Sequence, residues 1–179
     1  MKPGGLIPYL AKARWPCLSG YTLGLLLLTA CGSQTGSEPE LATQQLCLVT
    51  AEQQQTLVAE LAVTPQQREA GLMHREALDF DAGMLFIYPT EAVRRFWMYQ
   101  TPLPLDIAFF DRAGELLAIE TMEPCTAAIA HLCPRYGPEQ PFQYALEVNA
   151  GYFHFYELTA PAELRLGDCE TALEEWREP

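Results

Sequence analysis

Short apolar segments separated by turn signals limit the folds open to this chain more than any other feature. Residues 56–63 alternate in polarity, with Leu57, Leu61 and Val63 on one face of the expected strand. Residues 111–114 lie between two such segments and are typical of a hairpin turn. The other segments expected to form strands are residues 84–88, 96–99, 105–110, 115–120, 144–148 and 162–166. This pattern predicts a mainly β (α+β) domain of mostly antiparallel strands, arranged as a sandwich or a partly closed barrel.

Two segments favour short helices. Thr64, Pro65 and Gln67 match an N-cap, a proline at the first helical position and the closing residue of a capping box. Gly71 predicts the end of this helix, which we expect near residues 65–70. Residues 150–158 form a second, aromatic-rich candidate.

The N-terminus has the pattern of an export signal. Three cations precede an apolar stretch at residues 18–30, which is about 13 residues long, whereas a membrane-spanning helix needs roughly 20. The stretch ends in Leu28-Thr29-Ala30-Cys31, which resembles a bacterial lipobox, in which the cysteine is lipidated and becomes the mature N-terminus. We predict that residues 1–30 are a lipoprotein signal peptide and that Cys31 is lipidated. An ordinary secretory signal is the alternative.

The remaining chain divides into three parts. Residues 31–45 begin with a Gly- and Ser-rich run typical of a flexible tether, residues 46–168 carry the strand pattern, and residues 169–179 are an acidic tail. Gly32 follows Cys31, which implies sorting to the outer membrane if the source is diderm. We therefore expect a lipid-anchored protein of the cell envelope, with the membrane as its partner through the N-terminal lipid.

The charge of the chain excludes one class of partner. The whole sequence has 11 basic and 23 acidic residues. From Cys31 onward eight Arg and no Lys face all 23 acids, which leaves a net charge of −15. A surface this acidic repels phosphate backbones, so we expect no nucleic-acid partner.

The cysteines agree with export. Cys47, Cys125, Cys133 and Cys169 form an even set, which in an exported chain favours disulfides. Cys125 and Cys133 flank a short loop, so we predict that they pair. Cys47 then pairs with Cys169, or both stay free. The chain has no Cys-X-X-Cys pair typical of a zinc site, and we predict no metal or cofactor.

Several segments together resemble the domain-of-unknown-function 192 family, an uncharacterised bacterial and archaeal group. The resemblance covers about residues 57–168, and Tyr99-Gln100 stands where the family usually has Lys-Asn. It implies a compact, mostly β domain with one or two short helices, and no established activity. The Cys125…Cys133 pair resembles the exported branch of the family. The segments that carry the resemblance are 60–62, 71–75, 83–86, 96–101, 104–107, 145–147 and 167–168.

Three acids, Glu60, Asp106 and Glu147, stand singly in apolar strand segments. A buried carboxylate without a partner is costly, so each must gain a cation, a set of hydrogen bonds or a proton. Arg68 and Arg75 flank the end of the expected helix and are the best-placed cations, since guanidinium groups bind carboxylates with two parallel hydrogen bonds. We expect Arg75 to meet at least one of the three acids beside Trp97.

This acid–Arg cluster supports two interpretations. Trp97 and Met98 can form the apolar wall of a groove, in which the cluster binds a ligand. Alternatively the cluster is a structural network that fixes strand register and helix docking.

The sequence leaves three classes of function open. A binding or accessory module for a small-molecule or glycan ligand is the first, because no catalytic motif is present. An envelope hydrolase that uses two of the acids is the second. The third is copper handling by Met and His side chains, although the same methionines lie in apolar runs that favour core packing: Met73, His74, Met84, Met98 and Met122.

Overall fold

The computed structural model describes residues 41–158, 160 and 162–171. The predicted signal peptide, the lipidation site, and most of the tether and the acidic tail lie outside these residues. No helix in the described part of the chain is long and apolar enough to cross a membrane.

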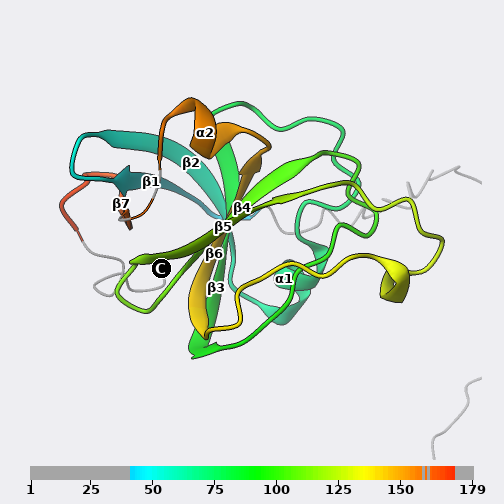
Figure 1. Ribbon diagram of the computed structural model, residues 1–179. Coiled ribbons are helices and arrows are strands. Elements are labelled where there is room, and N and C mark those ends of the chain that lie inside the picture. The colour runs from blue at the N-terminus through cyan, green and yellow to red at the C-terminus, as the bar shows by residue number, and fades with distance from the viewer. Residues whose placement is uncertain (1–40, 159, 161, 172–179) are drawn as a thin grey trace, which may run out of the picture. The chain divides into compact units, whose positions relative to one another are not determined.

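Seven strands form one sheet in the order β5-β4-β6-β3-β2-β1-β7 (Figure 1). All neighbouring pairs are antiparallel except β2 and β3, which run parallel because α1 lies between them in sequence. The sheet confirms the mainly β prediction, and it is a single sheet rather than the two sheets of a sandwich. The strands are β1 Thr43–Val49, β2 Gln54–Ala62, β3 Ala82–Ala92, β4 Leu105–Phe110, β5 Leu116–Met122, β6 Phe142–Asn149 and β7 Glu163–Leu166.

Helix α1 (Pro65–Ala70) follows the predicted capping pattern. The Gln67 backbone N–H donates to Thr64 Oγ1 at 3.2 Å, and the Thr64 N–H donates to Gln67 Oε1 at 2.9 Å. Gly71 ends the helix with a φ of 49°. The other helices are α2 (Tyr152–Phe155) and a short 3₁₀ turn at Ala130–Leu132.

The prediction of a strand at residues 96–99 is wrong. Phe96 makes an isolated bridge with Tyr136, and Tyr99 makes one with Cys125, but no continuous ladder forms. Gln100 has a left-handed φ of 55°, which turns the chain out of the extended conformation. This segment is a buried loop across the sheet.

Strand β1 begins at Thr43, within the residues expected to be tether. It pairs with β2 on one side and with β7 on the other.

The curled sheet has an apolar core on each face. The inner face packs Leu57, Leu85 and Phe110 against Tyr152 of α2. The outer face packs Phe86, Phe109 and Phe142 against the loop residues Phe96 and Met98. Residues of the loops 93–104 and 123–141 pack against the outer core. These loops therefore cover the outer face, where the candidate site lies.

The two ends of the sheet approach each other beside β7. The Leu116 N–H of β5 donates to the Ala162 carbonyl at 2.9 Å, and the Leu164 N–H of β7 donates to the Gly114 carbonyl at 2.8 Å. The strand order describes an open sheet with β5 and β7 at its two edges. These hydrogen bonds nevertheless bring β5 and β7 close together.

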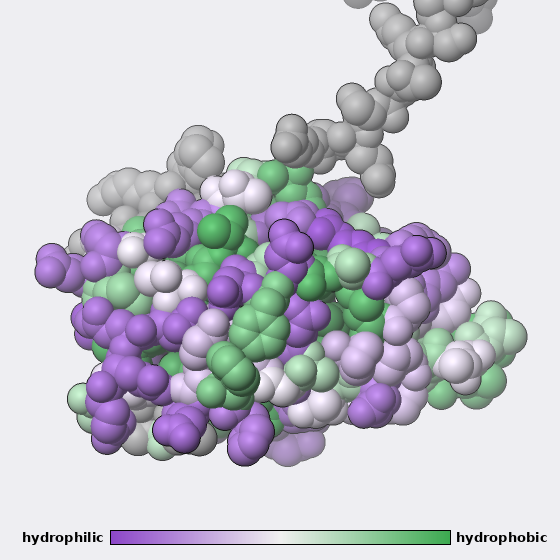
Figure 2. Space-filling view, turned by 90° about the horizontal axis from the view of Figure 1, so that it is seen from above, coloured by the Kyte–Doolittle hydropathy of each residue, from purple (hydrophilic) through white to green (hydrophobic). Residues whose placement is uncertain are grey.

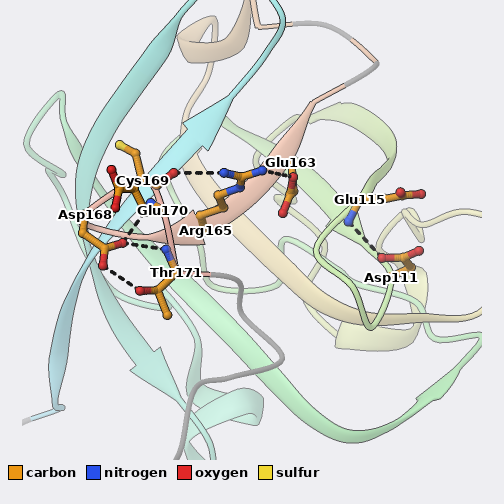
Figure 3. A network of polar contacts seen from close by, with 8 residues as sticks. All are labelled: Asp111, Glu115, Glu163, Arg165, Asp168, Cys169, Glu170 and Thr171. Carbon is orange, nitrogen blue, oxygen red and sulfur yellow. Dashed lines mark hydrogen bonds and ion pairs between the residues drawn. The ribbon is translucent and has the colours of Figure 1, made fainter.

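Polar contacts hold the segment after β7 (Figure 3). Arg165 donates to Glu163 at 2.7 Å and to the Cys169 carbonyl at 3.1 Å. The Asp168 carboxylate accepts hydrogen bonds from Glu170 and Thr171, which keep the pKa of Asp168 below its usual value. These contacts therefore fix the segment around Cys169.

Two disulfides are present. Cys125 pairs with Cys133, as predicted, and closes the loop over the outer face. Cys47 pairs with Cys169, which settles the alternative that the sequence left open. The second bond joins β1 to the segment that follows β7.

One end of the molecule exposes aromatic side chains. Figure 2 looks down on the α2 end and shows apolar residues at the surface among polar ones. Phe80 and Phe155 are 45% and 67% exposed, and their ring centroids lie 5.1 Å apart in edge contact.

Candidate functional site

The three acids do not lie on one face of the sheet. Glu60 pairs with Met84 across β2 and β3, and Met84 pairs with Glu147 across β3 and β6, so Glu60 and Glu147 share the outer face. Their backbones are two strand spacings apart, about 10 Å. Asp106 pairs with Val148, a residue of the inner core, and therefore points to the opposite face.

Arg75 meets Glu60 as expected. Arg75 Nη1 lies 2.5 Å from Glu60 Oε1, and Arg75 Nη2 lies 2.6 Å from Glu60 Oε2. The hydrogen bond to Glu60 raises the pKa of Arg75, against the opposing effect of burial. The side chains are 32% and 27% exposed, so this bidentate pair is only partly removed from water.

Asp106 satisfies its carboxylate without an arginine. Oδ1 accepts a hydrogen bond from the Thr121 hydroxyl at 2.7 Å, and Oδ2 accepts one from the Gly151 N–H at 2.9 Å. Asp106 is 4% exposed. It ties β4 to β5 and to the start of α2, and its expected place in the acid–Arg cluster is wrong.

Glu147 differs from the other two acids because it is buried without a partner for its carboxyl group in the part of the chain that the structure describes. It is 5% exposed, and among the described residues its side chain makes no hydrogen bond and no ion pair. Burial raises the pKa of Glu147 to about 8. At neutral pH the carboxyl group is therefore mostly neutral and can donate a hydrogen bond.

The Glu147 side chain lines a pocket of about 180 Å³ on the outer face. Helix α1 contributes Arg68 to the pocket, and β3 contributes Tyr88. The loop at residues 95–101 contributes Arg95 and Trp97. Arg135 comes from the loop that contains the Cys125–Cys133 disulfide. Four segments of the chain thus meet around one buried acid, which lies on β6.

Arg68 lies in the last turn of α1. It donates hydrogen bonds to the backbone carbonyls of Val63 and Ile87, the second at 2.8 Å, and its guanidinium lies 4.8 Å from the centre of the Tyr88 ring. Arg94 lies 4.0 Å from the same ring. Burial raises the pKa of Tyr88, and the two arginines oppose this rise. Arg68 is thus positioned by backbone carbonyls and an aromatic ring.

The other two pocket arginines differ in their partners. Arg95 forms an ion pair with Glu139 at 2.5 Å and donates to the Gly137 carbonyl at 2.6 Å. The Arg135 guanidinium lies 4.1 Å from the centre of the Trp97 ring, a cation–π contact. Among the described residues neither Arg68 nor Arg135 forms an ion pair, so these two supply the unneutralised positive charge of the pocket.

The sequence-based candidates therefore occupy four different places. Arg68, Trp97 and Glu147 line the pocket, whereas Glu60 and Arg75 form an ion pair that does not line it. Met98 is only 1% exposed, packs in the outer core and lines no wall of this pocket, so its expected role in a groove wall is wrong. Asp106 belongs to the inner face.

Sequence reasoning missed three residues: Tyr88, Arg95 and Arg135. The scarcity of cations is the signal that could have identified the two arginines. The chain has only eight Arg and no Lys after the predicted signal peptide, so each Arg is a candidate partner for an acid or a ligand. Arg94 and Arg95 stand three and two positions before Trp97, respectively.

Metal ligands do not gather around this pocket. Among the residues that the structure describes, no group of three His, Cys, Asp or Glu side chains is arranged to hold a metal ion. Met84, Met98 and Met122 are all buried in the outer apolar core.

Two solved structures resemble the chain. One is the crystal structure of a proposed transcription regulator from Sinorhizobium meliloti 1021, with 33% identity and a TM-score of 0.65 over 73% of this chain and 98% of that one. The other is a protein of unknown function from Novosphingobium aromaticivorans DSM 12444, with 23% identity and a TM-score of 0.59 over 68% of this chain and 83% of that one. The second likeness concerns the fold alone.

No curated protein matches the chain. The model of the domain-of-unknown-function 192 (DUF192) family, described as an uncharacterized ACR, matches residues 47–166. This range runs from β1 to the end of β7 and includes every described residue of the pocket. The chain therefore belongs to the DUF192 family.

Proposed function

We propose that this protein is a binding module of the cell envelope, held at the membrane by a lipid on Cys31, and that its pocket binds a small anionic ligand. The anchor rests on the charged leader and on the lipobox-like residues 28–31. The ligand class rests on the pocket itself.

A concentration of arginines in a strongly acidic protein carries the proposal. Arg68, Arg95 and Arg135 line one pocket, although the chain after the signal peptide has a net charge of −15. Glu139 neutralises Arg95, and Glu69 adds one acid at the rim, but Arg68 and Arg135 remain unpaired with any described carboxylate. A positive pocket in an acidic surface selects for an anion that enters it.

Glu147 supports the same ligand. A neutral carboxyl group at the pocket wall can donate a hydrogen bond to a carboxylate or phosphate oxygen, as an ionised one cannot. Trp97 adds a half-buried apolar surface beside Arg135. Together these groups provide two cations, one neutral donor and an aromatic face.

The name of the Sinorhizobium relative suggests a different role, in transcription. The charge of this chain opposes binding to nucleic acid, because phosphate backbones and an acidic surface repel each other. We therefore do not extend that role to this protein.

A hydrolase is the second candidate, and one observation favours it. Glu147, with a pKa of about 8, has the protonation state of a general acid, and Glu69 is a second carboxylate at the same pocket. Glu60 is engaged by Arg75 and Asp106 lies on the opposite face, so neither serves as the partner. A binding module needs fewer assumptions.

Titration with simple anions tests the proposal. The mature chain carrying Cys31→Ser is titrated with acetate and with phosphate at constant ionic strength, and the indole N–H signal of Trp97 is followed by NMR. Trp176, in the predicted tail, provides the only other indole of the mature chain. A saturable shift of the Trp97 signal, with no such shift for tetramethylammonium, supports an anion site. No saturable response to either anion would reject it.

A further inference from the structure

A groove of about 390 Å³ adjoins the cationic pocket on the outer face. It shares Glu69, Ala70, Met73 and Trp97 with the pocket, so the two lie side by side. Tyr99 and Ala130 line the far part of the groove. A ligand bound in the pocket can therefore extend into the groove without leaving the protein surface.

The groove differs from the pocket in chemistry. Its walls are mostly apolar or aromatic, with Ala70, Met73, Trp97 and Ala130 prominent, and no arginine lines it. The three arginines and the buried Glu147 line only the pocket. The positive charge is thus confined to the pocket, whereas Glu69, Ala70, Met73 and Trp97 line both the pocket and the groove.

Two fixed elements shape the groove. Ala70 is the last residue of α1, and Met73 lies in the turn that follows; a capping box and Gly71 fix where the helix begins and ends. Ala130 lies in the loop that the Cys125–Cys133 disulfide closes. The groove is therefore held by covalent and capped structure on both sides, as expected of a largely pre-formed ligand site.

We propose that the ligand is a small amphiphilic anion with a single apolar tail. This inference rests on the proposed anion-binding function. The anionic head, a carboxylate or a phosphate, lies between Arg68, Arg135 and the neutral Glu147. The tail crosses Trp97 and lies along Met73 and Ala130.

A chain-length series tests the tail. The mature Cys31→Ser chain is titrated with acetate, butanoate, hexanoate and octanoate below their micelle concentrations. Affinity rises about fourfold for each methylene that enters the groove, the factor that corresponds to about 0.8 kcal/mol per buried CH₂. Octan-1-ol, which has the tail without the charge, binds more weakly than octanoate.

Two results separate this inference from the proposed function. If acetate and octanoate bind equally, the pocket binds anions but the amphiphile inference is wrong. If no carboxylate binds and octan-1-ol does, both proposals are wrong. Octyl phosphate replaces octanoate in a parallel titration, and the tighter of the two identifies the head group.

A matched pair of variants locates the tail. Ala130→Phe fills the groove and lowers octanoate affinity toward that of acetate, while acetate affinity stays unchanged. Ala128→Phe adds the same ring at an exposed position of the same loop and leaves both affinities unchanged. Equal effects of the two variants on octanoate would overturn the assignment of the groove.

Discussion

Arg75 and Glu60 face each other through two parallel contacts, 2.5 Å from Nη1 to Oε1 and 2.6 Å from Nη2 to Oε2. This pair ties the turn after α1 to strand β2. It lies on the same face of the sheet as the pocket but does not line it. We expect the ion pair to support α1, which in turn presents Arg68.

Removal of the Arg75 side chain tests that role. We expect Arg75→Ala to lower the free energy of unfolding by about 1–3 kcal/mol, more than for an exposed pair and less than for a fully buried one. Chemical denaturation of the single variants and of Arg75→Ala combined with Glu60→Gln measures the coupling between the two residues. A coupling near zero would show that the contact does not stabilise the fold.

Glu147 makes stability depend on pH. Its pKa is about 8 in the folded protein against 4.5 for an ordinary glutamate, so the folded state keeps a proton that the unfolded state loses. The contribution of this group is present below about pH 4.5, declines as pH rises, and is lost above about pH 8. Thermal or chemical denaturation of wild type and Glu147→Gln across this range measures the decline.

Glu147→Gln stays neutral at every pH in that range. The variant is therefore expected to match wild type near pH 4.5 and to exceed its stability by several kcal/mol above pH 8. A stability difference between the two proteins that does not change with pH would contradict the assigned pKa.

The same group makes anion binding depend on pH. When Glu147 ionises near pH 8, it loses its donated hydrogen and adds a negative charge to a pocket that also contains Glu69. Arg68, Arg95, Arg135 and Tyr88 also line this pocket. Acetate affinity should fall as pH rises from about 7 to 9 in wild type and stay flat in Glu147→Gln. Parallel declines in both proteins would assign the titration to another group.

The two disulfides should differ in their effect on stability. The Cys47–Cys169 bond spans 122 residues and the Cys125–Cys133 bond spans 8. On the chain-entropy model their removal costs about 5 and about 2.5 kcal/mol, respectively. Denaturation of the Cys47→Ser/Cys169→Ser and Cys125→Ser/Cys133→Ser variants measures both values. A larger loss for the short loop would contradict the model.

Short-range sequence patterns correctly predicted the elements that depend mainly on interactions between residues close in sequence. Thr64 and Gln67 identified α1 because a capping box is a short-range pattern, and the turn at residues 111–114 identified the β4–β5 hairpin. Strand β1 was not predicted at all, and its start, with Thr43 and two glutamines, resembles tether. Leu46, Cys47 and Leu48 are all buried, so β1 shows no alternation there.

The segment at residues 96–99 shows the opposite error. Phe96 and Met98 are buried, which an apolar run predicts, but burial alone does not make a strand. The left-handed Gln100 prevents a ladder, and no propensity rule anticipates a positive φ at glutamine.

The candidate site was predicted in part. The cost of burying a charge singled out Glu60, Asp106 and Glu147 and predicted that Arg75 meets at least one of them, without telling which. It could not tell that Asp106 faces the inner core, because neighbouring strands and their faces are set by the sheet order. Arg95 and Arg135 reach the pocket on loops whose packing depends on the whole fold.

Arg135 and the pocket around it are proposed to bind an anion. The direct measurement compares acetate and octanoate affinity in Arg135→Ala and Arg112→Ala, which remove one positive charge each. Arg135 lines the pocket, whereas Arg112 lies exposed in the β4–β5 hairpin. We predict that Arg135→Ala weakens both anions roughly tenfold or more, as expected for a lost charge-assisted hydrogen bond, and that Arg112→Ala leaves both affinities unchanged. Equal affinities in the two variants would show that Arg135 does not contribute to anion binding.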